Sequence, residues 1–297
     1  KKPDQKGCSS PLAKGDHPEL DASEELDMDG IRMYQSMIGA LQWAVQLGRL
    51  DVTTAVTTMS GFRAAPRKGH LDRLRRIYGY LSKMRHGVIR IRTEEPDYSA
   101  IPDPEYDWEH TVYRGAEEVI PSDLPRPLGK RVVTTDYVDA NLYHDFVTGK
   151  SLTGILTFFN KTPVDWYSKK QATVETATYG SEYVAARTAT ERIMENRLYL
   201  RYLGVPVGKS WLFGDNESVV NSSSQPDAKL HKRHVALSFH RVREAIAAKV
   251  MRFIHIPGSL NPADILSKHW GYQQVWPLIR PILFWEGDTA LVYDEKA

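Results

Sequence analysis

The stretch Tyr137-Val138-Asp139-Ala140-Asn141 decides the predicted fold, because it places an acidic residue directly after residues 131–138, which have the composition of a β-strand. Further strands are predicted at 151–160, 163–168, 209–213 and 249–255, and helices at 180–203, from about 217, at 232–248 and at 262–268. This order of elements, β-β-β-α-β-α-α-β-α, predicts an α/β (α+β) fold in which helices pack on one sheet.

Four acidic residues take corresponding positions in this pattern. Asp139 and Asp215 each follow a predicted strand. Glu182 and Asp264 each lie in the first turn of a predicted helix. Because strand ends and helix starts meet at one edge of a sheet, we expect the four carboxylates to converge. Such a cluster repels itself unless cations offset its charge, so it predicts a metal site.

The cation that suits this set is Mg²⁺, which takes oxygen ligands and keeps several waters. Two ions ~3.5–4 Å apart would clamp the attacking and leaving oxygens of a phosphoryl displacement, and Mn²⁺ is expected to substitute. Each residue also has a purely structural explanation. Asp139 could favour a turn, Asp215 could cap a helix, and Glu182 and Asp264 could stabilise helix dipoles. The joint occurrence, in this order, favours the metal site.

The rest of the chain divides by composition into further segments. Residues 1–30 are polar and are predicted to be a mobile leader, and residues 31–92 carry three short amphipathic helices that predict a small helical domain. Residues 93–130 are acidic and rich in proline, which predicts a partly ordered linker whose tyrosines dock on a neighbouring surface. The α/β domain is expected at 131–270, with a C-terminal tail at 271–297.

Composition excludes several classes of protein. The net charge of +2 does not by itself indicate a nucleic-acid binder, so such a role must rest on local patches. The one cysteine, Cys8, cannot form an internal disulfide or a cysteine zinc cluster, which favours a reducing compartment. No apolar run approaches the ~20 residues that cross a bilayer. The polar N-terminus, which lacks an initiator methionine, favours a piece of a longer chain over a secreted protein.

Five stretches resemble motifs near the C-terminus of copia-type retrotransposon Pol polyproteins. They are Tyr137-Val138-Asp139-Ala140-Asn141, Ser151-Leu152-Thr153-Gly154, Trp166-Tyr167-Ser168-Lys169-Lys170-Gln171, Ser181-Glu182-Tyr183-Val184-Ala185 and Ala263-Asp264-Ile265-Leu266-Ser267-Lys268. The resemblance implies an RNase H-like mixed sheet flanked by helices, preceded by a small helical domain that is the connection or thumb of a polymerase. The polymerase motif Tyr-x-Asp-Asp is not found, so no polymerase activity is expected from this chain alone.

The resemblance also implies a function. The chain would be a divalent-metal-dependent endoribonuclease, a hydrolase that cuts the RNA strand of RNA–DNA hybrids, with Asp139, Glu182, Asp215 and Asp264 as catalytic residues and metal ligands. Its partners would be the hybrid and the upstream polymerase region of the same polyprotein, in cytoplasmic virus-like particles or in the nucleus. Residues expected to contact nucleic acid are Lys169, Lys170, Gln171, Asn216, Lys232, Arg233, His234 and Arg241.

Some alternatives remain open at this point. The family usually has Asp where Asn141 stands and a second Glu where Gly180 stands, which leaves open a catalytically decayed nucleic-acid-binding remnant. An integrase- or transposase-type nuclease that acts on DNA is the alternative class of enzyme. Asp136 is an alternative to Asp139 as the metal ligand of the first strand.

Overall fold

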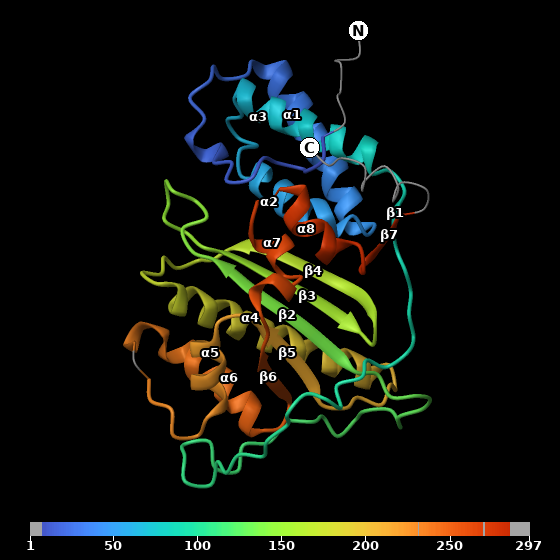
Figure 1. Ribbon diagram of the computed structural model, residues 1–297, viewed down its shortest axis with the longest axis vertical. Coiled ribbons are helices and arrows are strands. Elements are labelled where there is room, and N and C mark those ends of the chain that lie inside the picture. The colour runs from blue at the N-terminus through green and yellow to red at the C-terminus, as the bar shows by residue number, and fades with distance from the viewer. Residues whose placement is uncertain (1–7, 231, 270, 286–297) are drawn as a thin grey trace.

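A sheet of five strands lies at the centre of the molecule in the computed structural model, which describes residues 8–230, 232–269 and 271–285 (Figure 1). The strands are β2 (Thr134–Asn141), β3 (Leu152–Phe159), β4 (Thr162–Lys170), β5 (Ser210–Gly214) and β6 (Met251–His255), in the order β4-β3-β2-β5-β6. Parts of the predicted leader (1–7), the domain boundary (270) and parts of the predicted tail (286–297) lie outside the described residues.

The directions of the strands make the sheet mixed. β2, β3 and β4 pair antiparallel, and Asn160, at a φ of 54°, takes the left-handed conformation in the tight turn between β3 and β4. β2, β5 and β6 pair parallel, so a helix must cross over between each successive pair. The predicted mixed sheet flanked by helices is therefore confirmed.

Helices cover both faces of this sheet (Figure 1). On one face lie α4 (Thr178–Tyr202), α5 (Glu217–Ser224) and α6 (Ala236–Ala247), with the 3-10 turn Arg233–Val235 before α6. On the other lie α1 (Met28–Gln46), α2 (Thr53–Ser60), α3 (Lys68–Lys83), α7 (Asp264–Ser267) and α8 (Tyr272–Ile279). Three 3-10 turns, at Pro18–Leu20, Leu50–Val52 and Gly258–Leu260, and a small sheet of β1 (Gly87–Ile89) and β7 (Leu283–Trp285) complete the described structure.

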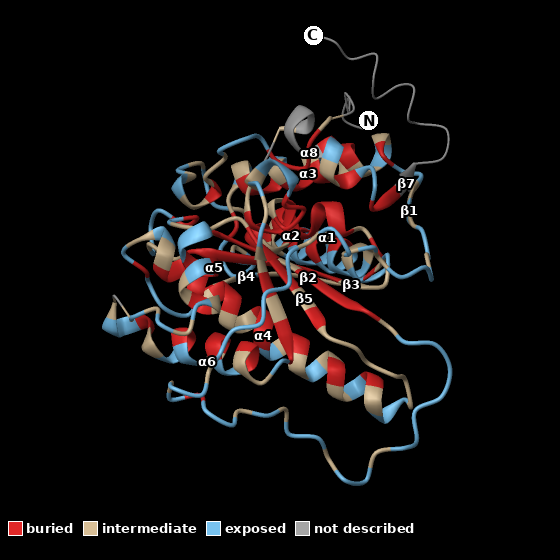
Figure 2. Ribbon diagram, turned by 60° about the horizontal axis from the view of Figure 1, so that its bottom comes forward, coloured by how far each residue is buried: buried red, intermediate tan, exposed pale blue. Residues whose placement is uncertain are grey.

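Two apolar cores hold these layers together, and in Figure 2 the buried residues gather on the sheet and on the helix faces that pack against it. Under α4, the small residues Ala185, Ala186 and Ala189 pack near Val138 and Ala140 of β2. Small side chains let the long helix lie close to the strand, which fixes the position of the first turn of α4 relative to β2.

The second core corrects the predicted division into separate domains. Leu156 of β3 and Ile265 of α7 belong to the same buried cluster as the helical residues Leu41, Val56 and Ile77. The Thr54 hydroxyl also donates to the Ile265 carbonyl at 2.7 Å. The helices of residues 31–92 therefore share their core with the sheet, because their apolar faces have no other surface to cover.

The predicted tail and leader also join the helical layer. Residues 271–285 form α8 and β7, and β7 pairs antiparallel with β1. Leu12 is 2% exposed, and the Arg73 guanidinium pairs with the carboxylates of Asp16 and Asp21 at 2.9 and 2.6 Å. The expectation of a mobile leader is therefore wrong for the segment around residues 12–21, which is packed against α3.

The acidic segment 93–130 has no helix or strand and follows the outside of the sheet domain. Two of its three tyrosines dock: the Tyr98 ring lies 4.9 Å from that of Trp211, and Tyr113 is 8% exposed, whereas Tyr106 is 37% exposed. The Glu118 carboxylate binds the guanidinium groups of Arg197 and Arg201 of α4. None of the described helices is long and apolar enough to span a membrane.

Leu156→Ala tests whether the two layers form one folding unit. Leu156 is fully buried between the sheet and the helical layer, so its truncation should cost ~2–5 kcal/mol of unfolding free energy in a single transition. Urea unfolding, followed by circular dichroism and by tryptophan fluorescence, measures this. Leu237→Ala, at a residue 81% exposed, is the control and should change little. Two separate transitions, of which only one moves, would contradict the shared core.

Candidate metal and active site

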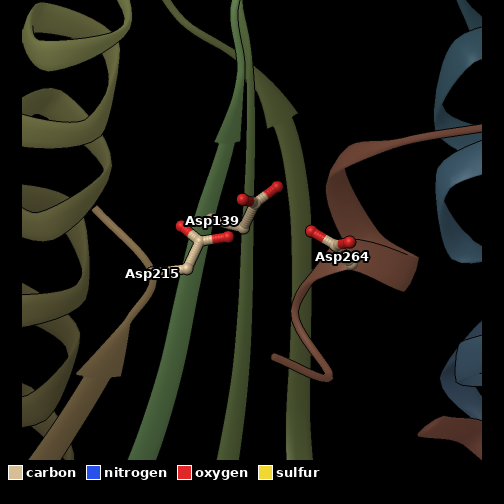
Figure 3. Close-up of side chains that lie close together, drawn as sticks. All are labelled: Asp139, Asp215 and Asp264. Carbon is tan, nitrogen blue, oxygen red and sulfur yellow. The ribbon is translucent and has the colours of Figure 1, made fainter. Parts of the chain in front are cut away.

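Three of the four predicted carboxylates meet at the sheet. Oxygens of Asp139, Asp215 and Asp264 all lie within 4.8 Å of one another, and Figure 3 shows the three side chains pointing toward a common space. Asp139 lies inside β2 rather than after it, because β2 continues to Asn141 through its pairing with β3. Asp215 directly follows β5, the parallel neighbour of β2, and Asp264 is the first residue of α7.

Local contacts fix α7 against the sheet. The Asn261 side chain donates to the Val138 carbonyl at 2.9 Å and accepts from the Ala263 amide at 3.1 Å, so it ties the start of α7 to β2. Gly154, which pairs with Asp139 in the sheet, leaves no space for a side chain between β3 and α7. A Cβ there would lie 2.8 Å from the Ala263 carbonyl oxygen, so only glycine lets α7 approach this closely.

The fourth carboxylate, Glu182, lies beside the other three, one turn into α4 rather than in its first turn, because α4 already begins at Thr178. It is 6% exposed, and burial, followed by the charges of Asp139 and Asp215, raises its pKa well above the usual value. It is not among the three whose oxygens lie mutually within 4.8 Å, but it belongs to the same electrostatic cluster. We use the name carboxylate cluster for Asp139, Glu182, Asp215 and Asp264 together.

Repulsion within the carboxylate cluster appears in the pKa values of its other members. Burial and the neighbouring Asp139 raise the pKa of Asp264 to about 6. Burial, followed by the charge of Asp139, also raises the pKa of Asp215. These shifts mean that the fold holds more negative charge here than it compensates, which favours binding of a cation.

Asp136 is outside this cluster. Side chains alternate along a strand, so Asp136 points to the opposite face of β2 from Asp139. There it is fully buried and accepts a hydrogen bond from the Thr157 hydroxyl, and burial raises its pKa to about 7. The structure therefore places Asp139, and not Asp136, at the candidate metal site.

Two site residues are missing from the sequence-based prediction. The Lys268 ammonium lies 3.2 Å from Asp139 Oδ1 and 2.6 Å from Asp264 Oδ1. The Ser267 hydroxyl donates to Asp139 Oδ2. The spacing of four residues between Asp264 and Lys268 on a helix is a signal that could have indicated this ion pair.

The basic residues predicted to contact nucleic acid lie on both sides of the carboxylate cluster. Lys169 is exposed at the end of β4, and Lys170 pairs with the Asp145 carboxylate at 2.5 Å. In the sheet these two lysines stand opposite residues 152 and 153, next to Gly154. This register places them two strands away from Asp139, at the same end of the sheet.

The second basic group precedes α6. Lys232 lies 6.0 Å from the centre of the Tyr179 ring and His234 lies 3.0 Å from the Glu175 carboxylate, so both sit beside the first turn of α4. Arg233 is exposed between them. Arg241, further along α6, pairs with Glu244 at 2.9 Å.

Two of the predicted contact residues, Gln171 and Asn216, also make hydrogen bonds within the protein. Gln171 is 5% exposed, and its amide donates to the Ser181 carbonyl at 2.8 Å and to the Thr153 hydroxyl at 3.0 Å. It therefore holds the first turn of α4 against β3, which leaves little of its side chain accessible to a nucleic acid. Asn216 caps α5, where its side-chain oxygen accepts from the Val219 amide at 3.2 Å.

The departures from the family motifs also have local explanations. At Gly180, a Cβ would collide with the Glu175 carboxylate, so the Glu175 side chain would have to move to admit a larger residue. The Asn141 side chain donates to His144 Nδ1 at 3.1 Å, in the loop that follows β2. Neither substitution removes a member of the carboxylate cluster.

The raised pKa of Asp264 predicts a pH dependence of stability in the presence of a chelator. The protonated carboxyl favours the folded state, and this contribution is lost as the pH rises from about 4, where the unfolded group ionises, through about 6, where the folded group does. Relative to the intact chain, Asp264→Asn should therefore become more stable between about pH 4 and about pH 7, by ~3 kcal/mol at most. Urea titration of both chains at about pH 4 and about pH 7 measures the difference in their unfolding free energies.

Asp123→Asn is the matched control for that experiment. Asp123 is exposed in the acidic segment and accepts a hydrogen bond from the Tyr202 hydroxyl of α4 at 3.4 Å. The difference in unfolding free energy between Asp123→Asn and the intact chain should not change with pH. A pH-independent difference for Asp264→Asn as well would show that repulsion does not act on this carboxyl.

Known proteins with a similar sequence include retrovirus-related Pol polyproteins. No family model matches the chain. It is 24% identical over 235 residues to the retrovirus-related Pol polyprotein from transposon TNT 1-94 of Nicotiana tabacum, covering 79% of this chain and 15% of the polyprotein. For the Pol polyprotein from transposon RE1 of Arabidopsis thaliana, the identity is 23% over 265 residues, covering 89% of this chain and 15% of the polyprotein. The expected resemblance is confirmed, and the chain spans about 15% of these relatives.

Among solved structures, the chain is similar to LC11-RNase H1, an enzyme isolated from compost, in its complex with an RNA/DNA hybrid. The sequence identity is 19% and the TM-score is 0.37, and the match covers 45% of this chain and 93% of that one.

Proposed function

We propose that this chain is a divalent-metal-dependent endoribonuclease that cuts the RNA strand of RNA–DNA hybrids. The observation that carries the proposal is the meeting of Asp139, Asp215 and Asp264 within 4.8 Å, with the buried Glu182 beside them. The resemblance to retrovirus-related Pol polyproteins supports the choice of substrate.

The donor set of the carboxylate cluster fits Mg²⁺. All four side chains offer oxygen, the ligand that Mg²⁺ and Mn²⁺ prefer. Asp139 interacts with each of the other three, since its charge raises the pKa of Glu182, of Asp215 and of Asp264. It is therefore suited to be the ligand that two ions share. When bound, two such ions supply an activated water and stabilise the charge that develops on the phosphate.

The residues around the cluster are suited to position a nucleic acid. Lys169 and Lys170 stand at one side, and Lys232 and Arg233 stand beside the first turn of α4. Ammonium and guanidinium groups at these places would bind phosphates on either side of the cut bond. His234 and Arg241 extend the same basic segment, and Asn216 adds an amide next to Asp215.

The proposal extends to the partners of the chain. The chain covers about 15% of the length of these polyproteins, so we infer an upstream polymerase region in the same polyprotein. The helical layer, which shares a core with the sheet, would then link that region rigidly to the nuclease. Cytoplasmic virus-like particles and the nucleus are the compartments that this role implies.

A cleavage assay on a labelled RNA–DNA hybrid tests the function. With Mg²⁺ or Mn²⁺ the intact chain should cut the RNA strand, and Asp139→Asn and Glu182→Gln should each lower the rate by at least ~100-fold, because each removes charge that would hold the ions. Asp123→Asn, the exposed control, should cut at the rate of the intact chain. Removal of the metal with a chelator should stop cleavage.

Other outcomes would contradict the proposal in distinct ways. Cutting of duplex DNA with the hybrid left intact would favour an integrase- or transposase-type nuclease. Hybrid binding with no cleavage at any metal concentration would favour a catalytically decayed remnant. Equal cleavage by the intact chain and by both cluster variants would remove the carboxylate cluster as the active site.

A further inference from the structure

The carboxylate cluster already contains one positive charge of its own. Lys268 Nζ lies 2.6 Å from an oxygen of Asp264 and 3.2 Å from an oxygen of Asp139, and it therefore bridges these two carboxylates. Asp139 is 1% exposed, whereas the Lys268 side chain is 39% exposed. The ammonium thus reaches into the site from a stem that stands partly in solvent.

This bridging position is one that a metal ion would need. An ion shared by Asp139 and Asp264 would bind the oxygens that Lys268 now contacts, at the ~2.0–2.1 Å typical of Mg²⁺. An ammonium and a divalent ion in contact with the same oxygens would repel each other strongly, since little water lies between them. One of the two must therefore leave.

The count of charges indicates which one leaves. Four ionised carboxylates carry a charge of −4, which two divalent ions neutralise completely. With Lys268 bridging Asp139 and Asp264 and no metal bound, the four carboxylates keep an excess of negative charge. With Lys268 and two ions, the site would carry excess positive charge. Lys268 can leave easily, because its long flexible stem is already partly exposed.

We propose that Lys268 is an internal counter-ion that occupies the place between Asp139 and Asp264 in the metal-free protein and yields it on metal binding. This inference rests on the proposed metal site. Lys268 keeps α7 attached to β2 in the absence of metal, together with the Ser267 hydroxyl that donates to Asp139. It also competes for the site, so it raises the metal concentration at which both ions bind.

Mn²⁺ binding to the full chain, counted by electron paramagnetic resonance, tests the competition without any cleavage. Lys268→Gln removes the charge and keeps a hydrogen-bond donor, so the weaker Mn²⁺ ion should bind at least ~10-fold more tightly. Lys268→Arg keeps the charge and should bind Mn²⁺ no more tightly than the intact chain does. Lys209→Gln is the matched control. Lys209 lies just before β5 and pairs with Asp103, so its substitution should leave Mn²⁺ binding unchanged.

Equal or weaker Mn²⁺ binding by Lys268→Gln would overturn the inference, because Lys268 would then be a structural tie that supports the ligands. If Lys268→Gln fails to fold, the intact chain offers a second readout. Acylation of lysines by an activated ester, read by mass spectrometry, should become several-fold faster at Lys268 when Mn²⁺ is added and should stay constant at Lys209. An unchanged rate at Lys268 would overturn the inference.

These readouts separate this inference from the proposed function. Both depend on metal binding alone, so they can succeed in a chain that cuts no hybrid. In that case the nuclease proposal fails and the role of Lys268 stands. Cleavage that depends on Asp139 and Glu182, with no change in Mn²⁺ affinity for Lys268→Gln or in the acylation rate of Lys268, would support the nuclease proposal and overturn the role of Lys268.

Discussion

Repulsion among carboxylates held together at the sheet is the constraint on which the rest of the structure depends. Burial, followed by the charges of neighbouring carboxylates, raises the pKa of Glu182, of Asp215 and of Asp264, so their ionised forms are disfavoured where the backbone holds them. Rigid supports prevent this: the parallel pairing of β2 with β5, the Asn261 side chain across the start of α7, and the close approach that Gly154 permits. The fold therefore keeps a site that is costly without cations and favourable with them.

Much of this site could be predicted from the sequence, because local patterns place acidic residues at the ends of elements. The order of strands and helices in the α/β region, and the positions of Asp215 and Asp264, follow from composition and periodicity. The choice between Asp136 and Asp139 could not be made from composition alone. It depends on which face of β2 each side chain takes, and that became visible only once the register with β3 was known.

What escaped prediction depends on contacts between distant parts of the chain. The three-residue strands β1 and β7 have no periodic signal of their own and form only because each provides the partner of the other. The docking of Leu12 and Arg73 joins segments that look polar and separate in the sequence. The burial of Gln171 was missed for the same reason, since a polar residue in a motif looks like a ligand contact until its two hydrogen-bond partners are placed.

The central claim is that the carboxylate cluster binds divalent ions as a unit, and a crystal structure with bound Mn²⁺ tests it most directly. The account predicts anomalous difference density for Mn²⁺ between Asp139 and the carboxylates of Asp215 and Asp264, with Lys268 turned away from it. Density at other surface carboxylates only, with the cluster still bridged by Lys268 at millimolar Mn²⁺, would contradict the account.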